Sequence, residues 1–302
     1  MSDIFTRNKR IKRKRAEFSA RFIFTSYNIH DKIIVTIDKV INIMKLTLMY
    51  FSPTHTTKKT VSAVGKVFFE KMLCETRVAD LTSLAGRMRE YSFAAEDVLI
   101  IGVPVYGGRI PQLLHSFLKG IKGNGARAVI LTVYGNRDYD DALLELYDFM
   151  TQQNFVVCAA GAFIGQHSYS EKVGAGRPDV EDLLAAGTFG LAAYEKVVSG
   201  KPVAKKIRGK RPYKEYSPSM LKLRQAPSED SAKCIRCGKC IEVCPVCNLD
   251  AKRHDSGRCI GCAACVRFCP VGARRLNDEN TVKAKKWLEE NCLARRTPEF
   301  FI

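Results

Sequence analysis

The chain has 302 residues, of which 46 % are hydrophobic and 26 % are charged. This composition allows a real hydrophobic core, so it excludes a largely disordered chain. A chain of this length typically folds into about two domains. The formal net charge of +18 would suit a nucleic-acid or membrane-surface protein only if it were gathered on one functional surface.

The positive charge is instead concentrated in two segments. Residues 1–43 carry +6 and residues 200–228 carry +8, whereas residues 44–199 are neutral. No nucleic-acid motif accompanies the basic run at 9–15, so we interpret it as a solvated tail and expect no nucleic-acid partner. Because the first clear strand begins right after Met44, we hypothesise that translation starts there and that the basic N-terminal extension is not native.

The sequence shows neither a membrane span nor an export signal. Its longest apolar stretch, residues 98–106, is far shorter than the roughly 20 residues that cross a bilayer, and charged residues interrupt the N-terminal part. We therefore expect a cytoplasmic protein. In a reducing compartment, 12 cysteines indicate metal or redox chemistry rather than disulfides.

Apolar runs and helical patterns alternate from Met44 onward. Continuous β-branched and aliphatic runs predict buried strands, and apolar residues spaced by three or four predict amphipathic helices. The predicted strands lie at 45–51, 98–103, 128–133 and 155–163, and the predicted helices at 57–73, 113–118, 143–150 and 180–198. This alternation predicts an α/β fold with a doubly wound parallel sheet over residues 44–199.

The chain changes character after this domain. Residues 200–228 are basic and contain several prolines, which predicts a linker that wraps against a domain. Residues 229–277 are loop-rich and dense in cysteine, which predicts a second, smaller domain. In residues 278–302 we expect a C-terminal helix at 282–293, which contains Trp287 and packs back onto the body.

The small domain contains two cysteine runs of the same form, Cys-x2-Cys-x2-Cys-x3-Cys-Pro. Their members are Cys234, Cys237, Cys240 and Cys244, and Cys259, Cys262, Cys265 and Cys269. Three cysteines at two-residue gaps allow one loop to curl around a cubane, and the proline then turns the chain away. The runs therefore predict two [4Fe–4S] clusters.

Zinc is the alternative metal, because thiolate tetrads also hold zinc. Zinc tetrads usually consist of two separated Cys-x2-Cys pairs, so the repeated four-cysteine run favours clusters. In runs of this type the fourth cysteine ligates the other cluster. We expect one cluster on Cys234, Cys237, Cys240 and Cys269, and the other on Cys259, Cys262, Cys265 and Cys244.

The remaining cysteines fit neither run. Cys247 lies between the runs, and we interpret Cys74, Cys158 and Cys292 as buried or incidental thiols. The +4 formal charge of residues 229–277 nearly cancels the charge of about −4 that two oxidised clusters with their eight thiolates bring. A less negative environment favours the reduced cluster and tends to raise its potential.

A hydroxyl-rich loop follows the first predicted strand and leads into a helix. Its residues are Ser52, Pro53, Thr54, His55, Thr56 and Thr57. Backbone N–H groups and the helix dipole attract an anion there, and the hydroxyls add donors, so the loop predicts a phosphate site. A plain helix-capping cluster is the alternative, and the Walker pattern is missing.

Two further loops follow strands at the same edge of the predicted sheet. The first contains Pro104, Tyr106, Gly107 and Gly108, and the second contains Tyr134, Gly135, Asn136 and Tyr139. An aromatic residue beside glycine suits a flat ring laid against backbone, and ligands of doubly wound sheets bind outside the carboxyl ends of the strands. Together the three loops predict a flavin site.

Residues 44–198 resemble flavodoxin, with YFSPTHTT in the place of its FMN phosphate loop, although flavodoxins commonly have Gly where this chain has His55. Residues 229–277 resemble bacterial two-cluster ferredoxins. The whole arrangement, including residues 209–215, looks like the EFR-family flavodoxin–ferredoxin fusions.

The resemblance implies a flavodoxin-like doubly wound sheet domain, a second, smaller α+β ferredoxin-like two-cluster domain and bound FMN. The loop at 52–57 would hold the phosphate of FMN, through Ser52, Thr54, His55, Thr56 and Thr57, and the aromatic and glycine residues of the two later loops would line its ring. His167 and Ser168 follow the last predicted strand, and they either approach this site or are ordinary loop residues.

We therefore predict an electron-transfer protein that relays electrons between FMN and two [4Fe–4S] clusters, with redox proteins as its partners. One alternative is a flavin-dependent oxidoreductase that acts on a small substrate with electrons from the clusters; His167 and Tyr139 are its candidate acid–base groups. A second alternative is a binding module whose α/β domain holds no flavin.

Overall fold

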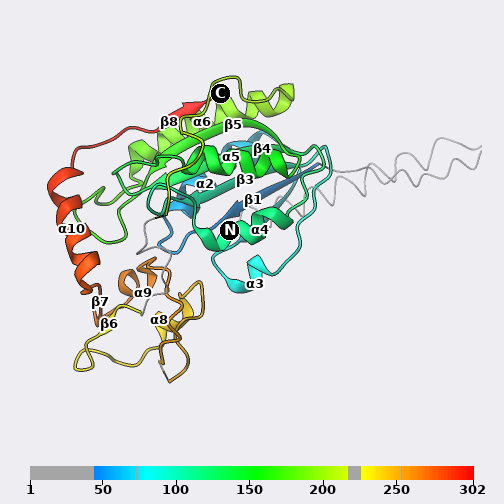
Figure 1. Ribbon diagram of the computed structural model, residues 1–302. Helices are drawn as coiled ribbons and strands as arrows, with labels where there is room; N and C mark the ends of the chain where they lie inside the picture. Colours follow the sequence, from blue (N-terminus) through cyan, green and yellow to red (C-terminus); the bar gives the residue numbers. More distant parts are fainter. Residues whose placement is uncertain (1–43, 73, 217–225, 253) are drawn as a thin grey trace, which may run out of the picture.

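The computed structural model describes residues 44–72, 74–216, 226–252 and 254–302. The predicted basic extension 1–43 and part of the predicted linker lie outside the described residues. A central sheet with helices on both faces forms the larger unit, and a smaller loop-rich unit lies beside one end of that sheet (Figure 1).

Six strands form the main sheet, in the order β2-β1-β3-β4-β5-β8. The first five are parallel to one another, and β8 pairs antiparallel with β5. The order 2-1-3-4-5 is the doubly wound, flavodoxin-like arrangement, so the predicted fold class is confirmed. The strands are β1 (Lys45–Tyr50), β2 (Glu75–Asp80), β3 (Val98–Pro104), β4 (Arg127–Tyr134), β5 (Val156–Ile164) and β8 (Glu299–Phe301).

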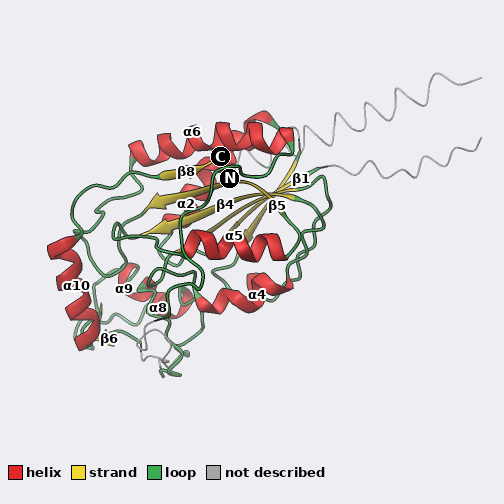
Figure 2. Cartoon of the chain, turned by 45° about the horizontal axis from the view of Figure 1, so that its top comes forward, coloured by secondary structure: helices red, strands yellow, loops and turns green. Residues whose placement is uncertain are grey.

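Helices cover both faces of this sheet (Figure 2). On one face α2 (Thr56–Lys71) and α6 (Val180–Ser199) bury Val61, Phe68 and Phe189 against β1, β3 and β4. On the other face α4 (His115–Gly120), which follows the short 3₁₀ helix η1 (Gln112–Leu114), and α5 (Ala142–Gln152) bury Leu118 and Leu146. Because both faces are covered, the central strands are nearly continuous apolar runs.

Local signals place the long helices. Asp179 and Asp182 form a capping box at the start of α6, and Gly200 ends it with φ 66°, a left-handed conformation that favours glycine. In α2 the predicted apolar residues Val64 and Phe68 are buried. These elements follow the spacing that the sequence predicts.

Three elements of the main sheet and its connections were absent from the sequence prediction. β2 is an edge strand in which Val78 is 55 % exposed, so it carries no apolar run. The four-residue helix α3 (Leu84–Arg87) follows it. β8 gains its partner only when the end of the chain returns to β5, and no local pattern reveals such pairing.

Residues 200–216 run along the outside of the larger unit. Ile207 is buried in the same core as α5, and the backbone N–H of Lys210 donates to Asp141 Oδ1 at 2.8 Å. The Tyr216 hydroxyl donates to the carbonyl of Ile110 at 2.9 Å. The described part of this segment is therefore packed against the α/β unit.

The smaller unit is built from short elements. β6 (Ser228–Glu229) pairs antiparallel with β7 (Arg274–Arg275) and closes the segment that holds the cysteine runs, which also contains α8 (Lys239–Glu242) and α9 (Ala264–Arg267). The last helix, α10 (Glu279–Asn291), packs Leu288 and the following Cys292 against Val173 of the larger unit.

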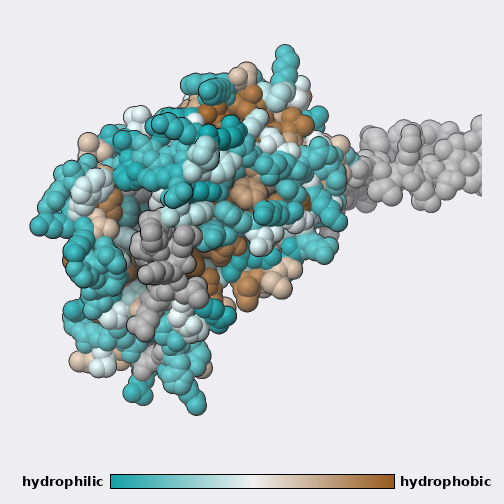
Figure 3. Space-filling model, in the orientation of Figure 1, coloured by the Kyte–Doolittle hydropathy of each residue, from teal (hydrophilic) through white to brown (hydrophobic). Residues whose placement is uncertain are grey.

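Much of the surface is polar. The face in Figure 3 is predominantly hydrophilic, with smaller hydrophobic areas between the polar ones. Among the described residues, none of the helices has the length and apolar character that crossing a membrane requires.

Arg109 and Glu145 form a nearly buried ion pair that joins the loop after β3 to α5. Arg109 Nη2 lies 2.7 Å from Glu145 Oε1, and Glu145 is 1 % exposed. We expect Arg109→Met to lower the free energy of unfolding by about 3 kcal/mol, because it removes the arginine from a buried carboxylate that then keeps only the His115 ring and the Ile110 N–H as partners. Urea denaturation measures this loss. Arg77→Met breaks an exposed pair with Glu75 and should cost less than about 1 kcal/mol; equal losses in the two variants would contradict the assignment.

Candidate functional site

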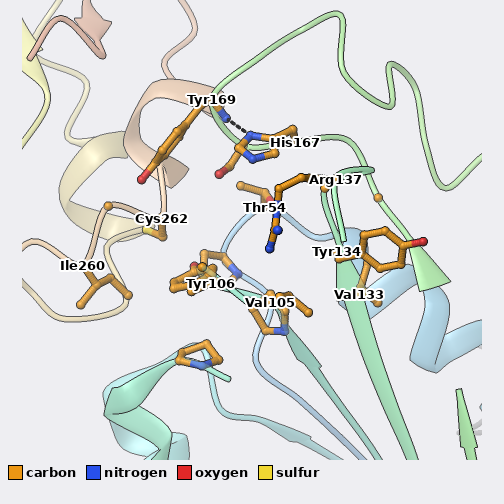
Figure 4. Close-up of a pocket in the computed structure, with 18 of the residues that line it drawn as sticks. Thr54, Val105, Tyr106, Val133, Tyr134, Arg137, His167, Tyr169, Ile260 and Cys262 are labelled. Carbon is orange, nitrogen blue, oxygen red and sulfur yellow. Dashed lines mark hydrogen bonds between the residues drawn. The ribbon is translucent and has the colours of Figure 1, made fainter. Parts of the chain in front are cut away.

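The loops after β1, β3, β4 and β5 meet at the carboxyl edge of the sheet, where a cavity of about 660 Å³ opens (Figure 4). From the sequence-predicted residues the structure brings together Ser52, Thr54, Thr56, Thr57, Pro104, Tyr106, Gly107, Gly108, Tyr134 and Gly135, as well as His167 and Ser168. The cavity volume falls within the range of small-molecule and cofactor pockets.

The first loop is tied down at Ser52. This residue is 2 % exposed, its backbone N–H donates to Thr82 Oγ1 at 2.8 Å, and its Oγ accepts from the backbone N–H of Lys58 at 2.9 Å. The loop then turns through His55, whose φ is 67°. This left-handed conformation favours glycine, which gives a backbone reason for the Gly that flavodoxins commonly have there.

Thr57 has an orphaned hydroxyl. Its side chain is fully buried and lines the cavity, and within the described parts of the chain its Oγ1 has no hydrogen-bond partner. A buried polar atom without a partner costs free energy. The first N–H groups of α2 also lack intrahelical acceptors. This edge of the cavity therefore offers several donors to an anionic group.

The second and third loops are held close to their neighbours by glycine. A Cβ on Gly108 would lie 2.1 Å from Asp140 Oδ2, and a Cβ on Gly135 would lie 2.5 Å from His167 Cδ2. The backbone N–H of Asp141 donates to the carbonyl of Gly108 at 3.0 Å. Glycine is thus required here for backbone packing around the cavity.

Three residues predicted for the flavin site do not line the cavity: His55, Asn136 and Tyr139. The His55 ring packs against Phe268 of the smaller unit, with ring centroids 4.6 Å apart. The Tyr139 hydroxyl donates to Glu299 Oε2 at 2.6 Å, and burial, followed by this bond, raises the pKa of Tyr139. Tyr139 is therefore committed to the C-terminal segment.

Asn136 also serves the C-terminal segment. It is 2 % exposed, and its Nδ2 donates to the carbonyls of Cys292 at 2.7 Å and Ala294 at 2.9 Å. Its Oδ1 accepts from Arg177 Nη1 at 3.2 Å. The prediction placed it correctly in the third loop, but its amide faces the end of the chain rather than the cavity.

Sequence reasoning missed several lining residues. Arg137 belongs to the third loop itself and points into the cavity (Figure 4); its position beside the predicted residues was the signal. Trp287 of α10, which is 51 % exposed, and Ile260 of the second cysteine run also line it. Their presence depends on how the smaller unit docks, which no local pattern encodes.

His167 is neutral in this environment. Burial and, to a lesser extent, the nearby charge of Arg137 together lower its pKa from 6.5 to about 4. Its Nδ1 accepts from the backbone N–H of Tyr169 at 3.1 Å (Figure 4). Among the described residues, Arg137 is the one lysine or arginine that lines the cavity; the carboxylate of Asp138 lines it as well, and Arg137 is paired with Asp140.

The cysteines separate into two groups. Cys234, Cys237, Cys240 and Cys269 line a small cavity of about 20 Å³; we call them the outer cysteine group, because Cys237 is exposed. Arg274 lines the same cavity. The fourth member of this group comes from the second cysteine run.

The other set, Cys259, Cys262, Cys265 and Cys244, is called the inner cysteine group. Burial raises the pKa of Cys262, and the neighbouring thiols of Cys265, Cys259 and Cys244 raise it further, against a backbone N–H that lowers it. Two of its members, Cys259 and Cys262, line the large cavity beside Tyr106 (Figure 4).

No three His, Cys, Asp or Glu side chains in the described part of the chain lie as close as a single metal ion requires. The three isolated cysteines Cys74, Cys158 and Cys292 are buried, as predicted, and burial raises the pKa of Cys158 to about 11. Cys247 is exposed and has φ 49°.

Residues 226–270 match the family model of the 4Fe–4S dicluster domain. No curated protein matches the chain. The flavodoxin-like fold together with this domain indicates a role in redox chemistry and electron transfer.

Solved structures resemble the α/β unit only distantly. The rubredoxin:oxygen oxidoreductase of Desulfovibrio gigas is 15 % identical over 52 % of this chain and 36 % of its own, with a TM-score of 0.39. A flavodoxin from the domain Archaea is 16 % identical over 51 % of this chain and 99 % of its own, with a TM-score of 0.38. This chain thus spans about a third of the oxidoreductase. The strand order, rather than these similarities, defines the fold class.

The lowered pKa of His167 makes folding sensitive to acid. Because the folded protein resists protonation of this ring, stability is fully present above pH 6.5 and is lost as the pH falls toward about 4. Urea denaturation at a series of pH values should therefore show a steeper loss in the wild type than in His167→Gln. Equal slopes for the two proteins would contradict a buried, neutral His167.

Proposed function

We propose that this chain is an electron-transfer protein that holds one FMN and two [4Fe–4S] clusters and relays electrons between them. One observation carries this proposal: Cys259 and Cys262 of the inner cysteine group line the same cavity as Thr54 and Thr57 of the predicted phosphate loop. A flavin in the cavity and a cluster on these cysteines would be direct neighbours.

The cavity walls fit FMN. The orphaned hydroxyl of Thr57 suits a phosphate, and so do the N–H groups of Thr56 and Thr57, which lack intrahelical acceptors at the start of α2. Tyr106, in the glycine-containing second loop, suits a flat ring. Tyr134 lines the cavity at the end of β4, but its ring points away from the cavity and packs against Tyr139 (Figure 4). The proposed flavin residues are Ser52, Thr54, Thr56, Thr57, Pro104, Tyr106, Gly107, Gly108, Tyr134 and Gly135.

The cysteine groups fit two clusters with exchanged fourth ligands. Cys269 joins Cys234, Cys237 and Cys240 around the small cavity, and Cys244 lies in the electrostatic neighbourhood of Cys262 and Cys265. This grouping supports the ligand sets inferred from the sequence. Bound FMN takes up electrons in pairs or singly, and clusters exchange them one at a time.

The chain itself would position the cofactors and keep water away. Tyr106 lies between Cys262 and the sheet edge, and Ile260 lies beside Cys262 in the cavity wall (Figure 4), so they would give the electron path an apolar, water-poor wall. Cys237 is exposed, which supports electron exchange between the outer cysteine group and a redox partner protein. By this proposal the chain is a cytoplasmic fusion of the EFR type.

A flavin-dependent oxidoreductase is the second candidate. The large cavity includes the wall of His167, Ser168 and Tyr169, where a small substrate could approach the flavin. Steady-state turnover of a small-molecule acceptor would favour this candidate over a pure relay. Tyr139 is no longer a candidate acid–base group, because it lies outside the cavity.

Thr57→Val tests the phosphate site. The variant loses one hydrogen bond to a charged group, so the dissociation constant of FMN should rise about ten- to a hundredfold. The flavin-free protein should become slightly more stable, because an unpaired buried hydroxyl is removed. Thr132→Val is the matched control, since Thr132 Oγ1 is also buried without a partner among the described residues but does not line the cavity. Fluorescence titration measures the affinity for FMN. An unchanged affinity in Thr57→Val would contradict the assignment of Thr57 to the phosphate site.

Cys262→Ala tests the relay. The anaerobically purified wild type should contain about eight irons and one FMN per chain, and the variant about half the iron with its flavin retained. Chemically reduced clusters should then pass electrons to FMN in the wild type at a rate independent of protein concentration, and far more slowly in the variant. Cys247→Ser, at an exposed cysteine of the same unit, should change neither quantity. A wild type with clusters but no flavin would refute the relay.

A further inference from the structure

Arg274 stands inside the smaller unit, in contact with the outer cysteine group. Its Nη2 donates to Cys240 Sγ at 3.8 Å, and the residue is 7 % exposed. Lysines and arginines are almost never this buried unless they are paired. A guanidinium therefore sits against one thiolate of the proposed outer cluster.

Among the described residues, the partners of Arg274 contact its two terminal nitrogens and leave its Nε–H unused. Nη1 donates to the carbonyl of Pro227 at 2.9 Å, and Nη2 lies 2.9 Å from Glu229 Oε2. The Nε–H is buried and has no partner among the residues that the structure describes. Arg274 also lines the 20 Å³ cavity with the four outer cysteines, so this donor borders the place where cluster sulfur would lie.

We propose that Arg274 holds and tunes the outer cluster, by donating N–H···S hydrogen bonds to its sulfurs and placing a buried positive charge beside it. This inference rests on the cluster half of the proposed function and is independent of the flavin. Hydrogen bonds to sulfur and nearby positive charge both favour the more negative, reduced state, so Arg274 raises the reduction potential of the outer cluster.

Glu229 opposes this effect. Its carboxylate pairs with the same guanidinium and partly neutralises it, at a site where little solvent screens the charges. Arg274 also acts on Cys265 of the inner cysteine group, although only through space. Its direct contact is with Cys240, so the outer cluster should respond more strongly than the inner one.

This asymmetry gives the relay a direction. The inner cysteine group borders the large cavity, and the outer group contains the exposed Cys237. A raised potential at the outer cluster draws electrons away from the cavity toward the surface. The outer cluster then becomes the position from which a partner protein takes up electrons.

The test is a redox titration of the full-length, anaerobically purified protein, followed by EPR. Arg274→Gln should lower the reduction potential of the outer cluster by at least about 59 mV. For a one-electron couple this shift equals a tenfold change in the ratio of oxidised to reduced cluster. Arg274→Lys keeps the charge and should restore part of the shift. Cys237→Ser, which changes a ligand of that cluster alone, assigns its signal.

Arg275→Gln is the matched control. Arg275 is the next residue of β7, its side chain is 54 % exposed, and it pairs with Asp230, so its removal should leave both potentials nearly unchanged. Glu229→Gln should raise the reduction potential of the outer cluster. If Arg274→Gln does not retain the four irons of that cluster, the result for Glu229→Gln tests the proposal instead. Unchanged potentials in a fully loaded Arg274→Gln, or no rise in Glu229→Gln, would overturn the proposal. A wild type without FMN would refute the relay and leave this test intact.

Discussion

The amide of Asn136 ties the end of the chain to the carboxyl edge of the sheet, and the arrangement of the two units depends on this tie. Its two N–H groups donate to the carbonyls of Cys292 and Ala294, and the group is almost fully buried. Losing it would leave two carbonyls without their donor in a poorly solvated place. Just beyond, Tyr139 holds Glu299 and β8 extends the sheet. α10 is thereby fixed beside the cavity.

Further contacts hold the smaller unit at the sheet edge. Arg87 donates to the carbonyl of Pro245, directly after Cys244, and Arg267 donates to Gln166 Oε1 at 3.0 Å. These contacts are polar, and their donors are the last residues of the short helices α3 and α9 rather than parts of a large apolar interface. They specify position more than they supply stability, and position is what electron transfer between neighbouring cofactors requires.

The sequence predicted the parts of the molecule that local patterns encode. Central strands such as β3 are apolar on both faces and stand out, whereas β2 exposes Val78 and β8 has a partner far away in the chain. The same holds at the site. Loop position identified Thr57 and Gly108, yet it could not tell that Asn136 faces Cys292, since the partner belongs to another part of the chain. Trp287 and Ile260 became cavity walls only through docking.

The charges of the smaller unit also show that the sequence alone does not reveal what the folded chain brings together. Counted along the sequence, nine basic and five acidic residues in 229–277 give +4, and every charge in that sum has equal weight. In the folded unit they are unequal, because solvent and salt screen an exposed charge such as that of Arg275 far more than a buried one. Arg274 is buried against Cys240, so its single charge acts on the cluster site more strongly than the exposed surplus does. The electrostatic environment of the clusters is therefore a property of placement, and a net charge is a poor measure of it.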